Sequence, residues 1–187
     1  ATLTDDLRDM FKSLFLNRDN EDVLGQDDNY EYSSGADRKF STLIRHIGKK
    51  EEQYNVLKAL VDCYPNESHL RGHLGRFLYE KATEQLDFEN AYDEITQAIE
   101  LGENDYNLWH LKGMSSRRRI EFLIRSDISK LNEDEISELE EFIKELTETA
   151  NEDFEKSRAI NPHNLHSHTA QVQMLIQVIN NGRRFSK

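Results

Sequence analysis

Long stretches of helical periodicity, rarely interrupted by turn residues, are the feature that most constrains the fold of this chain. Its 187 residues include two prolines and eight glycines, whereas an all-β chain needs a turn signal about every ten residues. Within the stretches, apolar residues recur at spacings of three and four, the period of an amphipathic helix. The sequence therefore predicts an all-α fold with essentially no sheet.

The apolar pattern divides into successive helices. Residues 17–35, rich in Asp, Asn, Ser and Gly, are expected to form a long loop. The expected helical faces are Leu7–Phe15, Phe40–Ile47, Tyr54–Tyr64, Leu70–Leu78 and Ala91–Ile99, followed by helices at about 106–126, 133–160 and 164–180. Because neighbouring helices are joined by short links, they are expected to pack as antiparallel hairpins, with one extended hairpin over 106–160.

Small residues at regular positions suggest that these hairpins are repeats. A tetratricopeptide unit of ~34 residues has small residues near positions 8, 20 and 27 and a proline near position 32. Gly75 fits position 8, and Ala91 and Ala98 fit positions 20 and 27 if the connecting loop is longer than usual. Over about residues 36–165 the chain thus resembles tetratricopeptide repeats.

A further unit can be aligned from Gly113. With Gly113 at position 8, Trp109 falls at the aromatic position 4, and a later group keeps the spacing of positions 20, 24, 27 and 32: Ala150, Phe154, Ser157 and Pro162. Lys112 and Ser116 depart from apolar positions of the pattern. The expected architecture is a right-handed superhelix of antiparallel helix pairs forming one domain over residues 1–187.

Three segments resemble a narrower family. Phe40-Ser41-Thr42-Leu43-Ile44, the run from Tyr64 to His69, and His73-Leu74-Gly75-Arg76-Phe77-Leu78-Tyr79 are similar to the helical-repeat region of large STAND-type P-loop defence proteins, both bacterial anti-phage and animal antiviral. The resemblance implies a sensor or scaffold region excised from a larger protein whose effector chemistry lies elsewhere. The 187-residue sequence contains no Gly-rich phosphate loop ending in Lys-Ser or Lys-Thr.

The net charge of −12 is concentrated in one segment. Residues 133–155 contain eleven acidic residues and one basic residue, and the remainder is nearly balanced. Generic binding to nucleic acid or to an anionic membrane surface is therefore disfavoured, because both depend on excess Lys and Arg. With a single cysteine, no charged leader and no apolar run near the ~20 residues of a membrane span, a cytoplasmic location is expected.

No catalytic residue, metal ligand or cofactor is predicted. His69 and His73 have the i, i+4 spacing of a helical metal pair, and three more histidines lie within residues 163–168, but neither group has the acidic or cysteine partners of a known signature. We interpret them as ordinary surface or interhelical histidines. Cys63 is expected to be a buried, inert thiol.

The acidic segment has a narrow apolar seam of coiled-coil character: Ile136, Leu139, Ile143, Leu146 and Ala150. Asn132 and Glu135 can form a capping box before it. The favoured partner of the seam is the helix at 106–126, and the alternative is self-association through residues 133–155. Because Arg117, Arg118 and Arg119 lie on that opposing helix, their first expected role is pairing with glutamates.

Partner capture is the favoured function, since the first helices of stacked repeats line a concave face. Contacts with a protein or peptide are expected there from His69, Arg76, Tyr79, Asn107, His110, Met114, Arg117 and Arg118. This set lacks the Lys and Asn arrangement with which carboxylate-clamp tetratricopeptides hold chaperone tails, so that class of ligand is not expected. The competing hypothesis is a nucleic-acid-binding repeat that uses Arg76, Arg117, Arg118, Arg119, Arg183 and Arg184.

Overall fold

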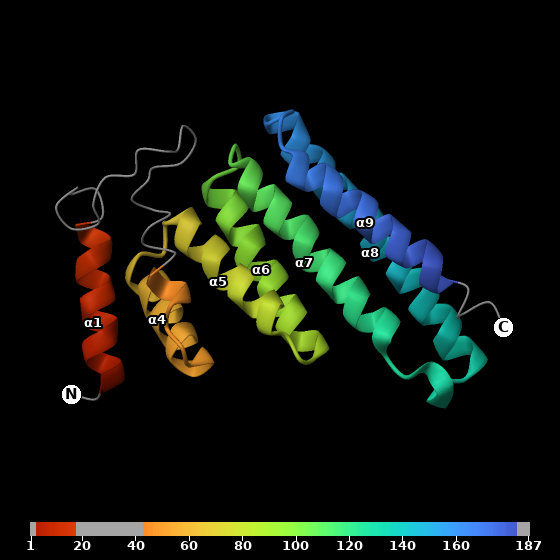
Figure 1. The fold of residues 1–187 in the computed structure, drawn as a ribbon, viewed down its shortest axis with the longest axis horizontal. Helices are drawn as coiled ribbons and strands as arrows, with labels where there is room; N and C mark the ends of the chain where they lie inside the picture. The colour runs from red at the N-terminus through yellow and green to blue at the C-terminus, as the bar shows by residue number, and fades with distance from the viewer. Residues whose placement is uncertain (1–2, 18–42, 183–187) are drawn as a thin grey trace. The chain divides into compact units, whose positions relative to one another are not determined.

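A computed structural model of the protein describes residues 3–17 and 43–182, which contain helices and no strand (Figure 1). The prediction of an all-α chain is confirmed for these residues. The helices are α1 (Leu3–Leu16), α4 (Lys50–Cys63), α5 (Ser68–Lys81), α6 (Gln85–Leu101), α7 (Tyr106–Arg125), the short 3-10 helix η1 (Ile128–Lys130), α8 (Glu133–Ile160) and α9 (Leu165–Gly182). Most of the predicted loop at 17–35, together with Phe40, Arg183 and Arg184, lies outside the described residues.

The chain divides into two compact units, residues 1–74 and 75–187, with the division inside α5. In the first unit α1 packs against α4, and the rings of Phe15 and Tyr64 lie 4.7 Å apart between centroids. The prediction that Cys63 is buried is wrong, since its thiol is exposed. Cys63 is the last residue of α4, where the helix ends, although its spacing places it on the apolar face.

The second unit has two hydrophobic clusters that share α7. One joins α5 and α6 to α7 through residues such as Tyr79, Ile95 and Leu108. The other joins α7 to α8 and α9, with Ile120, Phe154 and Met174 at its centre. Figure 1 shows α7 lying between α6 and the pair formed by α8 and α9. Helix α7 is therefore the element around which this unit is packed.

Two glycines allow the close helix contacts of this unit. A Cβ atom added to Gly75 would lie 2.5 Å from Cγ1 of Ile95 and 3.0 Å from the carbonyl oxygen of Ala91. A Cβ atom added to Gly113 would lie 2.8 Å from the ring of Phe154. All three distances are below ordinary van der Waals contact, so the crossings of α5 with α6 and of α7 with α8 each require a glycine.

The acidic helix α8 packs inside the chain. Its N-terminus has the predicted capping box, in which Asn132 and Glu135 each accept from the other's backbone N–H. Ile143 and Ala150 of the seam are buried in the cluster shared with α7 and α9, and Leu139 and Leu146 pack against it. The favoured pairing with the helix at 106–126 therefore accounts for the buried part of the seam.

Candidate functional site

Seven of the eight predicted contact residues lie in the second unit, on two helices. Arg76 and Tyr79 are on α5, and the others are on α7: Asn107, His110, Met114, Arg117 and Arg118. His69 lies in the first unit, where its Nε2 atom is 3.1 Å from Nε2 of His73 in a hydrogen bond between the two rings. His69 therefore belongs to the first unit and not to the set on α5 and α7 of the second unit.

The α5 and α7 residues lie within electrostatic reach of one another. His110 is largely buried, and this desolvation, followed by the positive charges of His166, Arg76 and Arg117, lowers its pKa from 6.5 to about 4. Arg76 and Arg117 are 41 residues apart in sequence, and both act on this imidazole. The helix packing thus assembles one face from residues of α5 and α7, and His110 is neutral there at pH 7.

Tyr79 differs from the expectation of an open aromatic contact. It is only 6% exposed and belongs to the cluster shared by α5, α6 and α7. Burial is the main cause that raises the pKa of its hydroxyl to about 12. The predicted role needs correction, because a side chain committed to the core has little area left for a partner.

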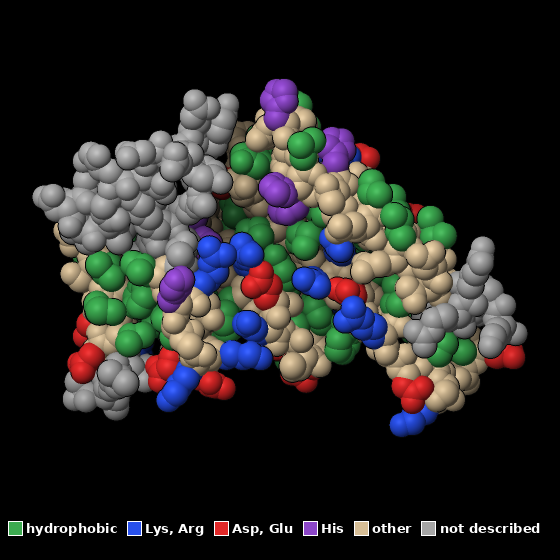
Figure 2. Space-filling model, in the orientation of Figure 1, with side chains coloured by type: hydrophobic (Ala, Val, Ile, Leu, Met, Phe, Trp, Pro, Cys, Tyr) green, Lys and Arg blue, Asp and Glu red, His purple; other side chains and the backbone are tan. Residues whose placement is uncertain are grey.

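The arginines on this face are only partly neutralised. Arg76 pairs with Glu80 at 2.7 Å, and Glu121 is shared by Arg118 and Arg125, each at 2.8 Å. The Nε atom of Arg117 is buried with no hydrogen-bond partner among the described residues, and burial lowers the pKa of this guanidinium. Figure 2 shows Lys and Arg side chains gathered over the middle of the visible face, with a few acidic side chains among them.

Arg119 turns away from this face toward α6. It donates to Glu89 at 2.6 Å and to Gln85 at 2.8 Å, and its guanidinium stacks over the ring of Phe142. The prediction that these arginines pair with glutamates is confirmed for Arg118 and Arg119. Their partners, however, are on α7 and α6 rather than on the acidic helix α8.

A polar pocket of about 300 Å³ opens beside the N-terminus of α7. Two predicted contact residues, Asn107 and His110, line it from α7. The link from α8 to α9 supplies Asn161, His163 and Asn164, and the first turn of α9 supplies Leu165 and His166. Helical periodicity carries no signal for this wall, because the link and the start of α9 reach the pocket only when α9 folds back beside α7.

Behind the pocket lies a buried hydrogen-bond network centred on Ser157 and Ser167, both 0% exposed. Ser157 donates its only hydroxyl proton to the Tyr106 carbonyl at 2.8 Å. The 3.0 Å contact between the two serines therefore requires Ser167 to donate to Ser157. The Asn164 amide donates to both serines, at 2.9 and 2.8 Å.

This proton count fixes the tautomer of His110. Since the Ser167 proton is already used, the 2.9 Å contact between its Oγ atom and Nδ1 of His110 requires Nδ1 to carry a proton. A neutral imidazole that is protonated at Nδ1 has an unprotonated Nε2 atom. His110 can therefore accept a hydrogen bond from an N–H or O–H group.

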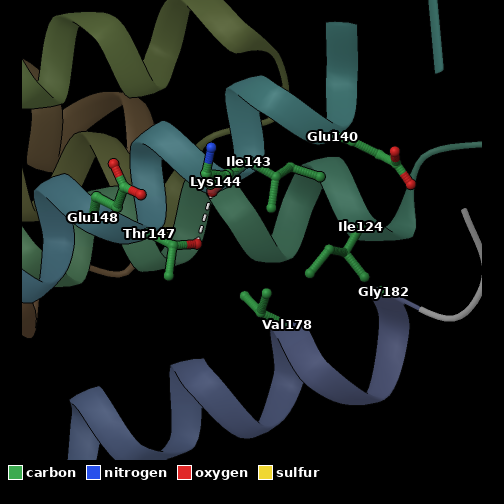
Figure 3. Close-up of a pocket in the computed structure, with 8 residues that line it drawn as sticks. All are labelled: Ile124, Glu140, Ile143, Lys144, Thr147, Glu148, Val178 and Gly182. Atoms are coloured by element: carbon green, nitrogen blue, oxygen red, sulfur yellow. Dashed lines mark hydrogen bonds between the residues drawn. The ribbon is translucent and has the colours of Figure 1, made fainter. Parts of the chain in front are cut away.

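A second cavity, of about 320 Å³, lies at the other end of α7, between α7, α8 and α9 (Figure 3). Ile124, Ile143 and Val178 form its apolar wall, and Glu140, Lys144 and Glu148 surround it. Thr147 turns its hydroxyl to the Ile143 carbonyl at 2.7 Å, leaving its methyl group to the cavity side. None of these residues was a predicted contact.

Comparison with family models, with curated proteins and with solved structures finds no match to this chain. The resemblance to tetratricopeptide repeats and to STAND-type defence proteins therefore stays a prediction. The part of the chain that the structure describes contains no cluster of three or more His, Cys, Asp or Glu side chains able to hold a metal ion. Within the same residues, no helix combines the length and apolar character of a membrane span.

Proposed function

We propose that this chain is a non-catalytic module that binds another protein, or a peptide segment of one, through the face formed by α5 and α7. The observation that carries the proposal is the convergence of Arg76, His110 and Arg117 from two helices on one face, beside a polar pocket. Binding energy at protein interfaces concentrates in a few anchors, among which arginine is over-represented.

The charges on this face favour an acidic segment as the partner. Four arginines (Arg76, Arg117, Arg118 and Arg125) share two glutamates there, in a chain whose net charge is −12. A carboxylate supplied by the partner would form charge-assisted hydrogen bonds with the partly exposed guanidinium groups of Arg76 and Arg118. Neutral His110 adds an acceptor for a backbone N–H or a hydroxyl of the same segment.

The repeat interpretation belongs to this proposal. The pairs α5 with α6 and α7 with α8, each closed by a glycine contact, support a tetratricopeptide-like organisation in which α5 and α7 are the first helices of successive units. On the sequence resemblance, the module would be the sensor or scaffold region of a cytoplasmic STAND-type defence protein. The presence of a P-loop in the full-length parent would support that assignment.

Nucleic acid is the other class of ligand attracted by a basic face. Of the arginines that this alternative requires, Arg119 is engaged with α6, while Arg183 and Arg184 lie outside the described residues. The arginines that remain for this alternative are Arg76, Arg117 and Arg118, and with Glu80 and Glu121 among them they form a small electrostatic footprint. We therefore favour a protein partner.

The test compares recovered partners between matched variants of the full chain. Pull-down from cells, with mass spectrometry, should show loss of specific partners for Arg76→Ala/Arg117→Ala and retention by Glu141→Gln/Glu148→Gln, which changes two exposed side chains of α8. Equal recovery by both variants would exclude the α5–α7 face. In parallel, binding to single-stranded RNA and duplex DNA is measured over a range of salt, and tight binding that falls steeply with salt would favour the alternative.

A further inference from the structure

Helix α9 is apolar on two opposite sides. One side is buried against α7 and α8 through Ala170 and Met174. The other side carries four large apolar side chains that remain exposed: Leu165 at 72%, Val172 at 55%, Ile176 at 51% and Ile179 at 68%. At 3.6 residues per turn the two sets lie about half a turn apart around the helix axis. A surface helix normally needs only the first of these sides.

The exposed residues form one continuous stripe. Their separations of seven, four and three residues keep them on one side of α9, as in the seam of a coiled coil. Single exposed apolar residues are ordinary, whereas an aligned row of them marks an interaction surface. Hydrophobic side chains gather over α9 in Figure 2. We refer to Leu165, Val172, Ile176 and Ile179 as the α9 stripe.

The charge distribution indicates what covers the stripe. None of the 18 residues of α9 is Asp, Glu, Lys or Arg, whereas each of the other described helices contains at least one such residue. The chain as a whole has a net charge of −12. Two copies repel each other over most of their surface, and this repulsion is weakest where the contacting helices are uncharged.

We propose that the α9 stripe pairs with the α9 stripe of a second copy, which gives a homodimer with two-fold symmetry. In such a dimer the same surface is used on both sides and has to be complementary to itself, as an uncharged apolar row is. The surface differs from the seam within residues 133–155, which α7 and α9 occupy. A helix of 18 residues is about 27 Å long, so the interface is small and association depends on concentration.

The experiment is sedimentation equilibrium of the full chain from low to high micromolar concentration. The wild-type mass should rise toward twice the monomer mass. Ile176→Glu should raise the dissociation constant at least about tenfold, because dimerisation would bury an unpaired charge. Gln173→Glu is the matched control: it adds the same charge to an exposed position of α9, a quarter of a turn from the stripe, and should change the constant by at most about threefold.

Salt dependence and a second variant keep the result interpretable. Added salt should leave dimerisation unchanged or strengthen it, because salt screens the repulsion between two acidic chains. Val172→Ser should weaken it without adding charge, and melting curves should show that all variants remain folded. A chain that stays monomeric throughout, or an Ile176→Glu variant that dimerises like the wild type, overturns the proposal; the first outcome would mean that another molecule or segment covers the stripe.

Discussion

The Nδ1 atom of His110 lies 2.9 Å from the Oγ atom of Ser167, a residue 57 positions later in the chain. This bond joins α7 to α9, and with Ser157 and Asn164 it fills every donor and acceptor of two buried hydroxyl groups. The network therefore connects three helices directly behind the polar pocket. Its loss should affect both the stability of the second unit and the geometry of the α5–α7 face.

Ser157→Ala should lower the free energy of unfolding by about 1–3 kcal/mol. The substitution leaves the Ser167 hydroxyl proton and one Asn164 N–H without acceptors in a buried site, and unpaired buried polar groups incur this cost. Urea denaturation at pH 7 measures the change. Thr149→Ala is the control on the same helix, because its hydroxyl only donates to the Glu145 carbonyl at an exposed position. A cost at Ser157 no larger than at Thr149 would contradict the network.

His110 should destabilise the protein as the pH falls. Its pKa is about 4 when folded and 6.5 ordinarily, so between these values the unfolded chain binds more protons. The contribution of neutral His110 to the free energy of unfolding is therefore fully present above pH 6.5 and is lost as the pH falls toward 4. The expected loss from this residue is about 2 kcal/mol between pH 7 and pH 5.

Asp153 has the opposite dependence and has to be separated from His110. Burial raises the pKa of this carboxyl from 3.8 to about 6, so its contribution to stability falls as the pH rises from about 4 to 6. Comparing wild type with His110→Asn at each pH removes the Asp153 contribution, and Asn can retain the donor to Ser167. The stability difference between the two proteins should change with pH, and NMR titration should place the His110 pKa near 4. A parallel pH dependence of the two proteins would refute the assignment.

Gly75→Ala should destabilise the second unit by about 1–3 kcal/mol. The added methyl group would meet Ile95 and the Ala91 carbonyl at distances that force α5 away from α6. Gly48→Ala makes the same chemical change where nothing lies within 4 Å, so its effect should be near zero. Thermal unfolding followed by circular dichroism distinguishes them, and equal melting temperatures would show that the glycine contact is not required.

Tyr79→Ala should destabilise the fold, whereas Arg76→Ala should leave the stability of the protein nearly unchanged. Tyr79 is in the core, and removing a buried aromatic ring costs roughly 3–5 kcal/mol. Arg76 makes a half-exposed pair with Glu80, whose loss should cost less than about 1 kcal/mol. Partner affinity should therefore be tested with Arg76→Ala, after denaturation curves establish that its stability is retained. A Tyr79→Ala protein as stable as wild type would place this ring outside the core.

Much of the helical architecture could be read from the sequence. The expected helices at about 106–126, 133–160 and 164–180 lie at Tyr106–Arg125, Glu133–Ile160 and Leu165–Gly182, and the capping box at Asn132 and Glu135 is present. These features depend on periodicity and on contacts between residues close in sequence. Gly75 and Gly113 also stand out in the sequence, because a tight helix crossing admits only a small residue.

The tertiary structure decided how individual side chains are used. The repeat register assigned Tyr79 to an open groove, and helical periodicity assigned Cys63 to the interior, but the structure places Tyr79 in the core and Cys63 at the surface. Packing also brought residues 161–166 to the His110 pocket and left the second apolar side of α9 exposed. Local sequence fixes which residues share a helix face, but whether a face is buried depends on the helices that pack against it, and those contacts join residues far apart in the chain.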